Sequence, residues 1–177
     1  MGWFSPDMQT IQIEKALPDM VDKASDAELK KGFRTHLKQT KGQIRRLNQV
    51  FKKLKIEPRG TKCPAINGIL DEANEIAGEI DDKMVLNAAL IAAAQTVEHY
   101  EITRYGTLVA WAKLLDRNDV AKVLNMNLKE EKVTDKKLNG IAKRKINRKA
   151  VARQRKRPDA AERAENAMLV ASGIPAI

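Results

Sequence analysis

Cysteine, glycine and proline are all scarce in this chain of 177 residues. The single cysteine, Cys63, excludes an internal disulfide, and the 9 glycines and 6 prolines leave long stretches without a helix breaker. Few stretches alternate polar and apolar residues as strands do. The composition therefore predicts an all-α protein, and the length is sufficient for one domain with its own core.

Long apolar runs are also missing. The longest run, Ala88–Ala94, is far too short to cross a bilayer. The opening residues, MGWFSPDMQT, contain no recognisable secretory signal. Together with the lone cysteine, these shortages predict a cytoplasmic protein in a reducing compartment, without membrane attachment.

Acidic residues are absent from one segment, residues 136–157, which holds 11 Lys and Arg. Because the net charge of the chain is +10, the remainder carries close to −1, and we expect the basic charge to say little about the core domain. The segment is either a DNA-binding tail without sequence preference or a solvated, partly helical tail; it lacks the aromatic residues that stack on single strands. The candidate phosphate contacts are Lys143, Arg144, Lys145, Arg148, Lys149, Arg153, Arg155, Lys156 and Arg157.

Apolar residues recur at helical spacing in five segments. Four of these segments are long, and the third is short enough to be a crossover. We expect a helical bundle over residues 9–145 and a basic, partly disordered tail over residues 146–177. The expected helices run from about Gln9 to Ala24, Ala27 to Lys55, Ala65 to Glu79, Lys83 to Leu115 and Asp119 to Lys145.

Carboxylates interrupt the apolar faces of two of these helices. Glu98 and Glu101 lie in the most apolar helix on the stripes that face inward, and Glu131 and Asp135 lie on the inward stripe of the last helix. An unpaired buried carboxylate costs several kcal/mol, so each of these groups must be neutralised, paired or bound to a metal.

Two interpretations of the acids fit the sequence. In the ferritin-like arrangement, four helices contribute carboxylates and histidines to a site for two metal ions, and such ligands suit iron or manganese. In the alternative, the acids pair with lysine or arginine and only fix the register of the helices. The candidate ligands are Glu14 on the first helix, His36, Gln39 and Gln43 on the second, Glu98 and Glu101 on the fourth, and Glu131 and Asp135 on the fifth.

The segment DKMVLNAALIAAAQTVEHYEITRYGTLVAWAKLL resembles the signature of the YciE/YciF-type stress-response proteins, a branch of the ferritin-like superfamily. Supporting stretches are KALPDMVDKASDAELKKGFRTHLKQTKGQIRRLNQVF, IEPRGTKCPAINGILDEA and NLKEEKVTDKKLNGIA, so the resemblance covers about residues 12 to 145. It implies a ferritin-like helical bundle, often dimeric, with a di-metal carboxylate site between the long helices. It implies no established enzymatic reaction.

The chain departs from that pattern on its first two helices. The first helix is shortened, so Glu14 does not occupy the matching position, and the acid expected on the second helix is replaced by Gln39. By contrast, Glu98, Glu101, Glu131 and Asp135 stand as the resemblance implies. An amide brings no negative charge, so we expect one weak metal site or none. A shortened helix also leaves apolar surface on its neighbours, and this predicts a homodimer.

Three functions follow from these observations. The first is a ferritin-like stress-response protein with a weakened or lost di-metal site and no catalytic turnover. The second is an active di-iron or di-manganese oxidase, or a peroxide-consuming protein, with metal at Glu98, Glu101 and Glu131 and with Gln39 as a neutral ligand. The third is a DNA-associated protection protein that binds through its basic tail.

Overall fold

In the computed structural model, which describes residues 6–58 and 63–155 with side chains from Gln9 onward, every regular element is helical. The predicted all-α helical bundle is therefore confirmed, and the bounds of its helices agree with prediction to within about one turn. No helix in the described part of the chain is long and apolar enough to cross a membrane. The elements are α1 Pro6–Lys23, α2 Ala27–Leu54, α3 Pro64–Glu79, α4 Lys83–Leu114, α5 Asn118–Ile141, a π-helical turn η1 Ala142–Ile146 and α6 Asn147–Arg155.

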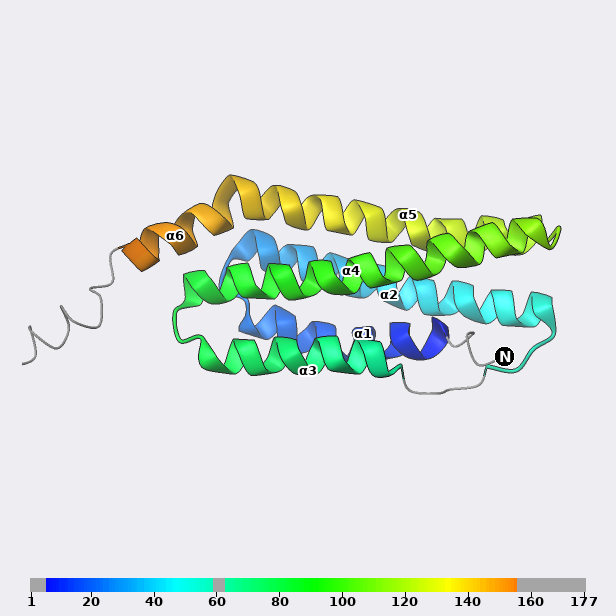
Figure 1. Cartoon of the computed structure of the whole chain (residues 1–177), viewed down its shortest axis with the longest axis horizontal. Helices are drawn as coiled ribbons and strands as arrows, with labels where there is room; N and C mark the ends of the chain where they lie inside the picture. Colours follow the sequence, from blue (N-terminus) through cyan, green and yellow to red (C-terminus); the bar gives the residue numbers. More distant parts are fainter. Residues whose placement is uncertain (1–5, 59–62, 156–177) are drawn as a thin grey trace, which may run out of the picture.

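Four long helices form the bundle, and α3 lies outside it (Figure 1). Helix α5 packs against α2 and α4, while α1 packs against α2 and more lightly against α4. The shorter α3 runs along α4 and α1 as a crossover between α2 and α4. This order places α2 and α4 across the bundle axis from each other, so their inward residues meet in its centre.

Aspartates fix the starts of the two longest helices. The Asp26 carboxylate accepts hydrogen bonds from the backbone amides of Glu28 and Leu29 at 3.0 and 3.3 Å. Asp82 accepts from the amides of Met84 and Val85 at 2.8 and 3.3 Å. Each cap satisfies amides that the helix itself leaves unpaired, and this sets the register of the inward faces.

The core consists of two apolar clusters with a polar layer between them. One cluster contains Phe33 of α2 and Leu138 of α5, and the other contains Leu47 of α2 and Leu124 of α5. Helix α1 contributes Ile13, Leu17 and Val21 to the first cluster, and none of its described residues belongs to the second. The buried polar residues of the layer are Gln9, Thr10, His36, Thr40, Gln43, Glu98, Glu101, Asn127, Glu131 and Thr134.

Helical structure continues beyond residue 145, where the sequence suggested that the bundle ends. Helix α6 packs against α4, and Ile146 and Ala150 are buried. Two of the predicted phosphate contacts, Lys156 and Arg157, lie outside the described residues.

Candidate metal centre

The polar layer gathers one ligating side chain from each of three helices. His36 of α2, Glu98 of α4 and Glu131 of α5 each occupy the inward face of their helix, with core residues one or two turns away on either side. One potential ligand atom from each of the three lies within 4.8 Å of the others, and all three side chains are buried. Such a group is compact enough to surround one cation.

The imidazole of His36 has a neighbour at each of its nitrogens, and the hydrogen bond is at Nδ1. Its Nε2 lies 3.0 Å from Oε1 of Glu98. Its Nδ1 lies 3.4 Å from the hydroxyl of Thr134, which donates its own proton to the carbonyl of Glu130. His36 therefore presents Nε2 to the carboxylates, as a histidine ligand does when its other nitrogen is held by a neighbouring group.

Glu101 completes the layer on the side of α1. The Thr10 hydroxyl donates to Oε1 of Glu101 at 3.2 Å, and it also lies 3.2 Å from the phenol oxygen of Tyr105. Glu101 and Tyr105 are both completely buried. Helix α1 therefore contacts Glu101 through the hydroxyl group of Thr10. None of its described residues places a carboxylate in the layer.

Burial dominates the electrostatics of the three glutamates. Desolvation raises the pKa of Glu98 to about 8, and the nearby negative charges of Glu101 and Asp135 also raise it. Desolvation raises the pKa values of Glu131 and Glu101 well above the usual range, and each is raised further by a neighbouring glutamate. In the described residues, no lysine or arginine forms an ion pair with any of the three. Without a bound cation, these acids are held largely in their protonated form at neutral pH.

Several oxygen atoms of the layer have no hydrogen-bond partner among the described residues. They are both carboxylate oxygens of Glu131, the Oε2 atoms of Glu98 and Glu101, and the amide oxygens of Gln9 and Gln43. Buried polar atoms are normally satisfied, so a group of unsatisfied oxygens beside an imidazole fits a hard divalent cation. The residues present therefore suit one metal ion, and iron and manganese are the metals that such ligands favour.

Three of the predicted ligands lie outside this cluster. Asp135 is at the edge of the α4–α5 interface, where it accepts from Gln95 at 2.8 Å and lies 3.2 Å from the exposed His99. Gln39 is half-buried in an outer groove between α2 and α5, and Glu14 faces Lys41 at 4.0 Å. The structure thus brings together His36, Gln43, Glu98, Glu101 and Glu131 of the predicted set in the polar layer.

Sequence reasoning missed Gln9, Thr10, Tyr105 and Asn127. Gln9 is one turn before the buried Ile13, and Asn127 is one turn before Glu131, so both lie on inward stripes that helical periodicity identifies. Tyr105 is likewise one turn beyond Glu101. The start of α1 at Pro6 and not at Gln9 explains why Gln9 and Thr10 are already helical and point inward.

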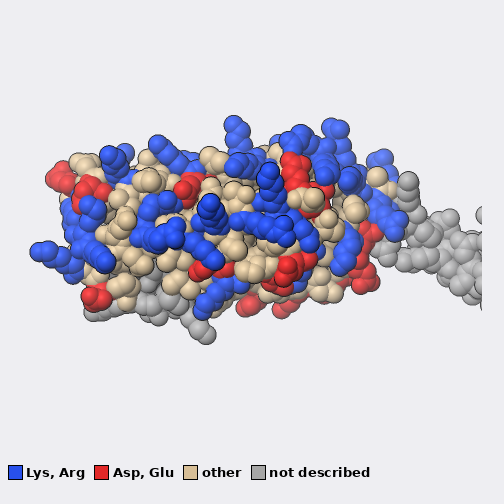
Figure 2. Space-filling view, turned by 180° about the vertical axis from the view of Figure 1, so that it is seen from behind, with Lys and Arg blue, Asp and Glu red and all other residues tan. Residues whose placement is uncertain are grey.

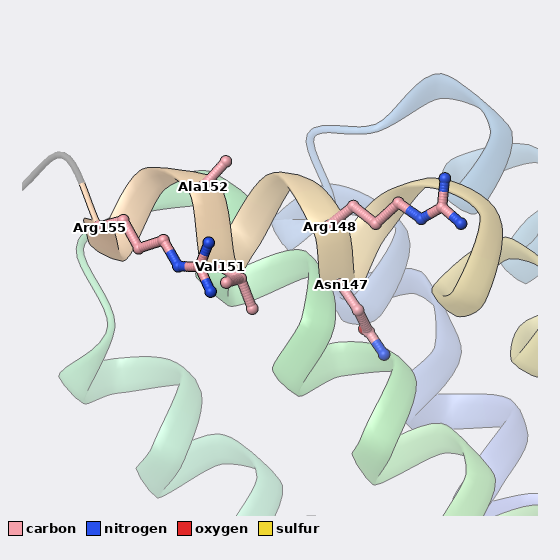
Figure 3. A pocket seen from close by; sticks show the side chains of 5 residues that line it. All are labelled: Asn147, Arg148, Val151, Ala152 and Arg155. Atoms are coloured by element: carbon pink, nitrogen blue, oxygen red, sulfur yellow. The ribbon is translucent and has the colours of Figure 1, made fainter.

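The bases of the predicted tail fall into two groups. Arg144, Lys145 and Arg153 form ion pairs with Glu28, Asp26 and Asp82, at 2.6, 2.6 and 2.7 Å, so they help to attach η1 and α6 to the starts of α2 and α4. The second group, Lys143, Arg148, Lys149 and Arg155, forms no ion pair within the described residues. Figure 3 shows Arg148 and Arg155 on the outer side of α6, at either end of a shallow hollow with Val151 between them.

Comparisons with known proteins agree with this architecture. Residues 8–151 match DUF892, a domain of unknown function. The protein YciF of Escherichia coli strain K12 is 42% identical over 140 residues, which are 78% of this chain and 84% of that protein. The chain belongs to the DUF892 family and is of the YciF type.

Two solved structures of this family share the fold. The crystal structure of the E. coli stress protein YciF is 40% identical, with a TM-score of 0.77 over 81% of this chain and 91% of that one. The structure of YcfI from Rhodopseudomonas palustris is 52% identical, with a TM-score of 0.76 over 78% of this chain and 88% of that one. The predicted membership of the YciE/YciF-type family is confirmed.

Proposed function

We propose that this protein is a ferritin-like stress-response protein of the cytoplasm that holds one divalent cation, iron or manganese, in its polar layer and does not turn over a substrate. The proposal is supported by the similarity to the E. coli stress protein YciF. The proposed metal site rests on one observation, the buried cluster of His36, Glu98 and Glu131. Their ligand atoms lie within 4.8 Å of one another, and no lysine or arginine of the described residues forms an ion pair with them.

The charges of the layer favour one cation over two. A divalent ion would balance the carboxylates of Glu98 and Glu131, and the third acid, Glu101, already receives a hydrogen bond from Thr10. The residues that α1 and α2 contribute to the layer are amides, hydroxyls and one imidazole, which bring no further negative charge. A bound cation would balance the carboxylate charge and, through its three ligands, connect α2, α4 and α5. An oxidase with two metal ions would need carboxylates on α1 and α2 as well, and the described residues of these two helices place none in the layer.

Titration of the metal-free protein with Mn(II), followed by electron paramagnetic resonance of the unbound ion, tests the proposal. We expect one bound ion per chain. Replacing Glu131→Gln should weaken binding by about a hundredfold or more, because it removes a charged ligand from a buried site. The matched control Glu14→Gln removes an acid outside the cluster and should bind as the unchanged protein does. Equal binding by the two variants, or no binding by the unchanged protein, contradicts the proposal.

The proposal includes a homodimer formed at the end of the bundle that contains the second apolar cluster, to which no described residue of α1 belongs. There the second apolar cluster is open to solvent through a groove of about 240 Å³, lined by residues that include Leu47, Phe51 and Trp111. Leu114 and Leu115 at the same end of α4 are 81% and 72% exposed. A second copy would bury this surface. Light scattering at micromolar concentration should give twice the mass of the chain, and a monomer contradicts this part of the proposal.

A further inference from the structure

The bundle has one strongly basic side and one acidic side. Helix α2 contains nine Lys and Arg and a single acid, Glu28, whereas α3 contains four acids and no base. The net charge outside residues 136–157 is therefore close to zero because the positive charge of one surface cancels the negative charge of another. The expectation that basic charge is local to that segment and says little about the core domain is wrong, because α2 belongs to the core.

The basic residues of α2 and α5 form two regular stripes. On each helix, four exposed cations recur at intervals of seven residues, which is close to two helical turns. Each stripe therefore follows one side of its helix over most of its length. The two stripes consist of Lys31, Lys38, Arg45 and Lys52 on α2, and of Lys122, Lys129, Lys136 and Lys143 on α5 and η1.

The two stripes lie on one face of the molecule. Helices α2 and α5 pack side by side, with Arg46 of α2 bonded to Asn127 and Glu130 of α5 at their interface. A groove between them is lined by Lys31, Lys136, Lys137 and Arg144, among others. Figure 2 views the molecule from the side opposite to Figure 1 and shows Lys and Arg side chains spread along its length.

The stripe cations have no internal electrostatic role. Within residues 6–58 and 63–155, none of the eight forms an ion pair. This separates them from Arg144, Lys145 and Arg153, whose ion pairs attach η1 and α6 to the bundle. A row of exposed, unpaired charges of one sign attracts an extended partner of opposite charge.

We propose that the α2–α5 face binds the phosphate backbone of duplex DNA without sequence preference. The 28 residues of α2 make a helix about 42 Å long, which matches about 12 base pairs of duplex. Neither helix exposes an aromatic side chain, because Phe33 and Phe51 of α2 are buried and α5 contains none. Single strands would need such side chains for stacking. Helix α2 exposes no large apolar side chain, and α5 exposes only Met126 and Val133, at 50% and 46%. Two isolated apolar side chains give no apolar face for insertion into a lipid surface.

Fluorescence anisotropy with a labelled mixed-sequence duplex and the full chain tests this proposal over a range of salt concentrations. The stripe variant carries Lys38→Gln, Arg45→Gln and Lys129→Gln. Its slope of log affinity against log salt should be smaller by about 3, with an affinity loss of about tenfold or more in low salt. The matched control carries Lys15→Gln, Lys83→Gln and Lys113→Gln, which remove the same charge from exposed positions outside the stripes. It should keep the original slope.

A third variant separates the face from α6. Replacing Arg148→Gln, Lys149→Gln and Arg155→Gln removes exposed bases of α6 and should behave as the control does. The proposal is overturned if this variant loses the most affinity, or if all three variants lose it equally. Equal or tighter binding to a single-stranded oligonucleotide, or to vesicles of anionic phospholipid, also overturns it. All nine positions are on the surface, so we expect every variant to fold. Thermal unfolding followed by circular dichroism verifies this.

Discussion

The two halves of the polar layer differ in charge although they face each other across a few ångströms. The α4–α5 half contributes three buried carboxyl groups, Glu98, Glu101 and Glu131. The α1–α2 half contributes buried amides, hydroxyls and the imidazole of His36. A symmetric carboxylate site would carry acids on all four helices. Here the acidic half needs positive charge or protons, and the neutral half can orient a ligand but cannot balance a second ion.

This difference would allow the metal site proposed above to be weaker than a site with four carboxylate helices while the fold is kept. The amides and hydroxyls of α1 and α2 fill their places in the layer, and some of them bond to the acids, as Thr10 does to Glu101. The two apolar clusters on either side of the layer supply the packing that the bundle requires. Most of the packing therefore comes from residues outside the layer, so side chains of either half can be exchanged while the fold is kept.

The largest expected effect comes from the acidic half in metal-free protein. Desolvation raises the pKa of Glu98 from 4.5 to about 8, so the folded state keeps a proton that the unfolded state releases. The free energy of unfolding should therefore fall as pH rises from about 5 to about 9, by on the order of 5 kcal/mol for this group. Urea unfolding in the presence of a chelator measures the change.

Two variants provide the comparison for this pH dependence. Glu98→Gln removes one titrating group and should reduce the fall in stability, so that the variant is more stable than the unchanged protein at high pH, while Glu101 and Glu131 still contribute a fall of their own. Glu14→Gln changes an acid outside the layer and should leave the profile as it is. A stability that stays constant between about pH 5 and about pH 9 would show that the buried carboxyls are not protonated in the folded protein.

An intermediate effect is expected from adding an acid to the neutral half. Gln9 is buried close to Glu101, so Gln9→Glu would supply a fourth carboxylate and should allow a second Mn(II) to bind. Gln39→Glu places the acid in the outer groove between α2 and α5 and should leave the number of bound ions unchanged. Electron paramagnetic resonance of the unbound Mn(II) gives the number of ions bound per chain by difference. A gain from Gln39→Glu alone would mean that the second helix, and not the first, limits the site.

The smallest effect concerns the hydroxyl that joins the two halves. Thr10→Val keeps the shape of the side chain but removes the donor to Glu101 and the contact with Tyr105. Leaving a buried acceptor unpaired should lower the free energy of unfolding by about 1–3 kcal/mol. Thr35→Val, at an exposed position of α2, is the matched control for the loss of a hydroxyl. Equal unfolding midpoints in urea for the two variants would contradict a role for Thr10 in the layer.

Helical periodicity was sufficient to predict the helices and the burial of four polar side chains in the bundle. His36, Glu98, Glu101 and Glu131 lie on inward stripes of long amphipathic helices, and their burial follows from that position. Asp135 is four residues beyond Glu131, yet it is at the edge of the α4–α5 interface, because four residues rotate the side chain by about 40° more than a full turn. Periodicity alone does not distinguish the middle of a stripe from its edge.

Other features depend on which helices are neighbours, and the order of the chain does not give this. The contact of Thr10 with Glu101 joins residues that are 91 positions apart, so no local pattern predicts it. The basic face has the same origin, because its two stripes come from α2 and α5, and the acids that cancel their charge in the total lie on α3 and other helices. Net charge by sequence segment therefore concealed a surface that the packing of the helices creates.

The metal content of the purified protein tests the central claim most directly. Plasma mass spectrometry after anaerobic incubation with Fe(II) and desalting should find one iron per chain, because Glu98, Glu131 and the imidazole of His36 are close enough together to hold a single cation. Two irons per chain would contradict the account by showing that the neutral half holds a second ion. A chain that retains no iron would contradict it as well, and would mean that the buried glutamates are neutralised by protons alone.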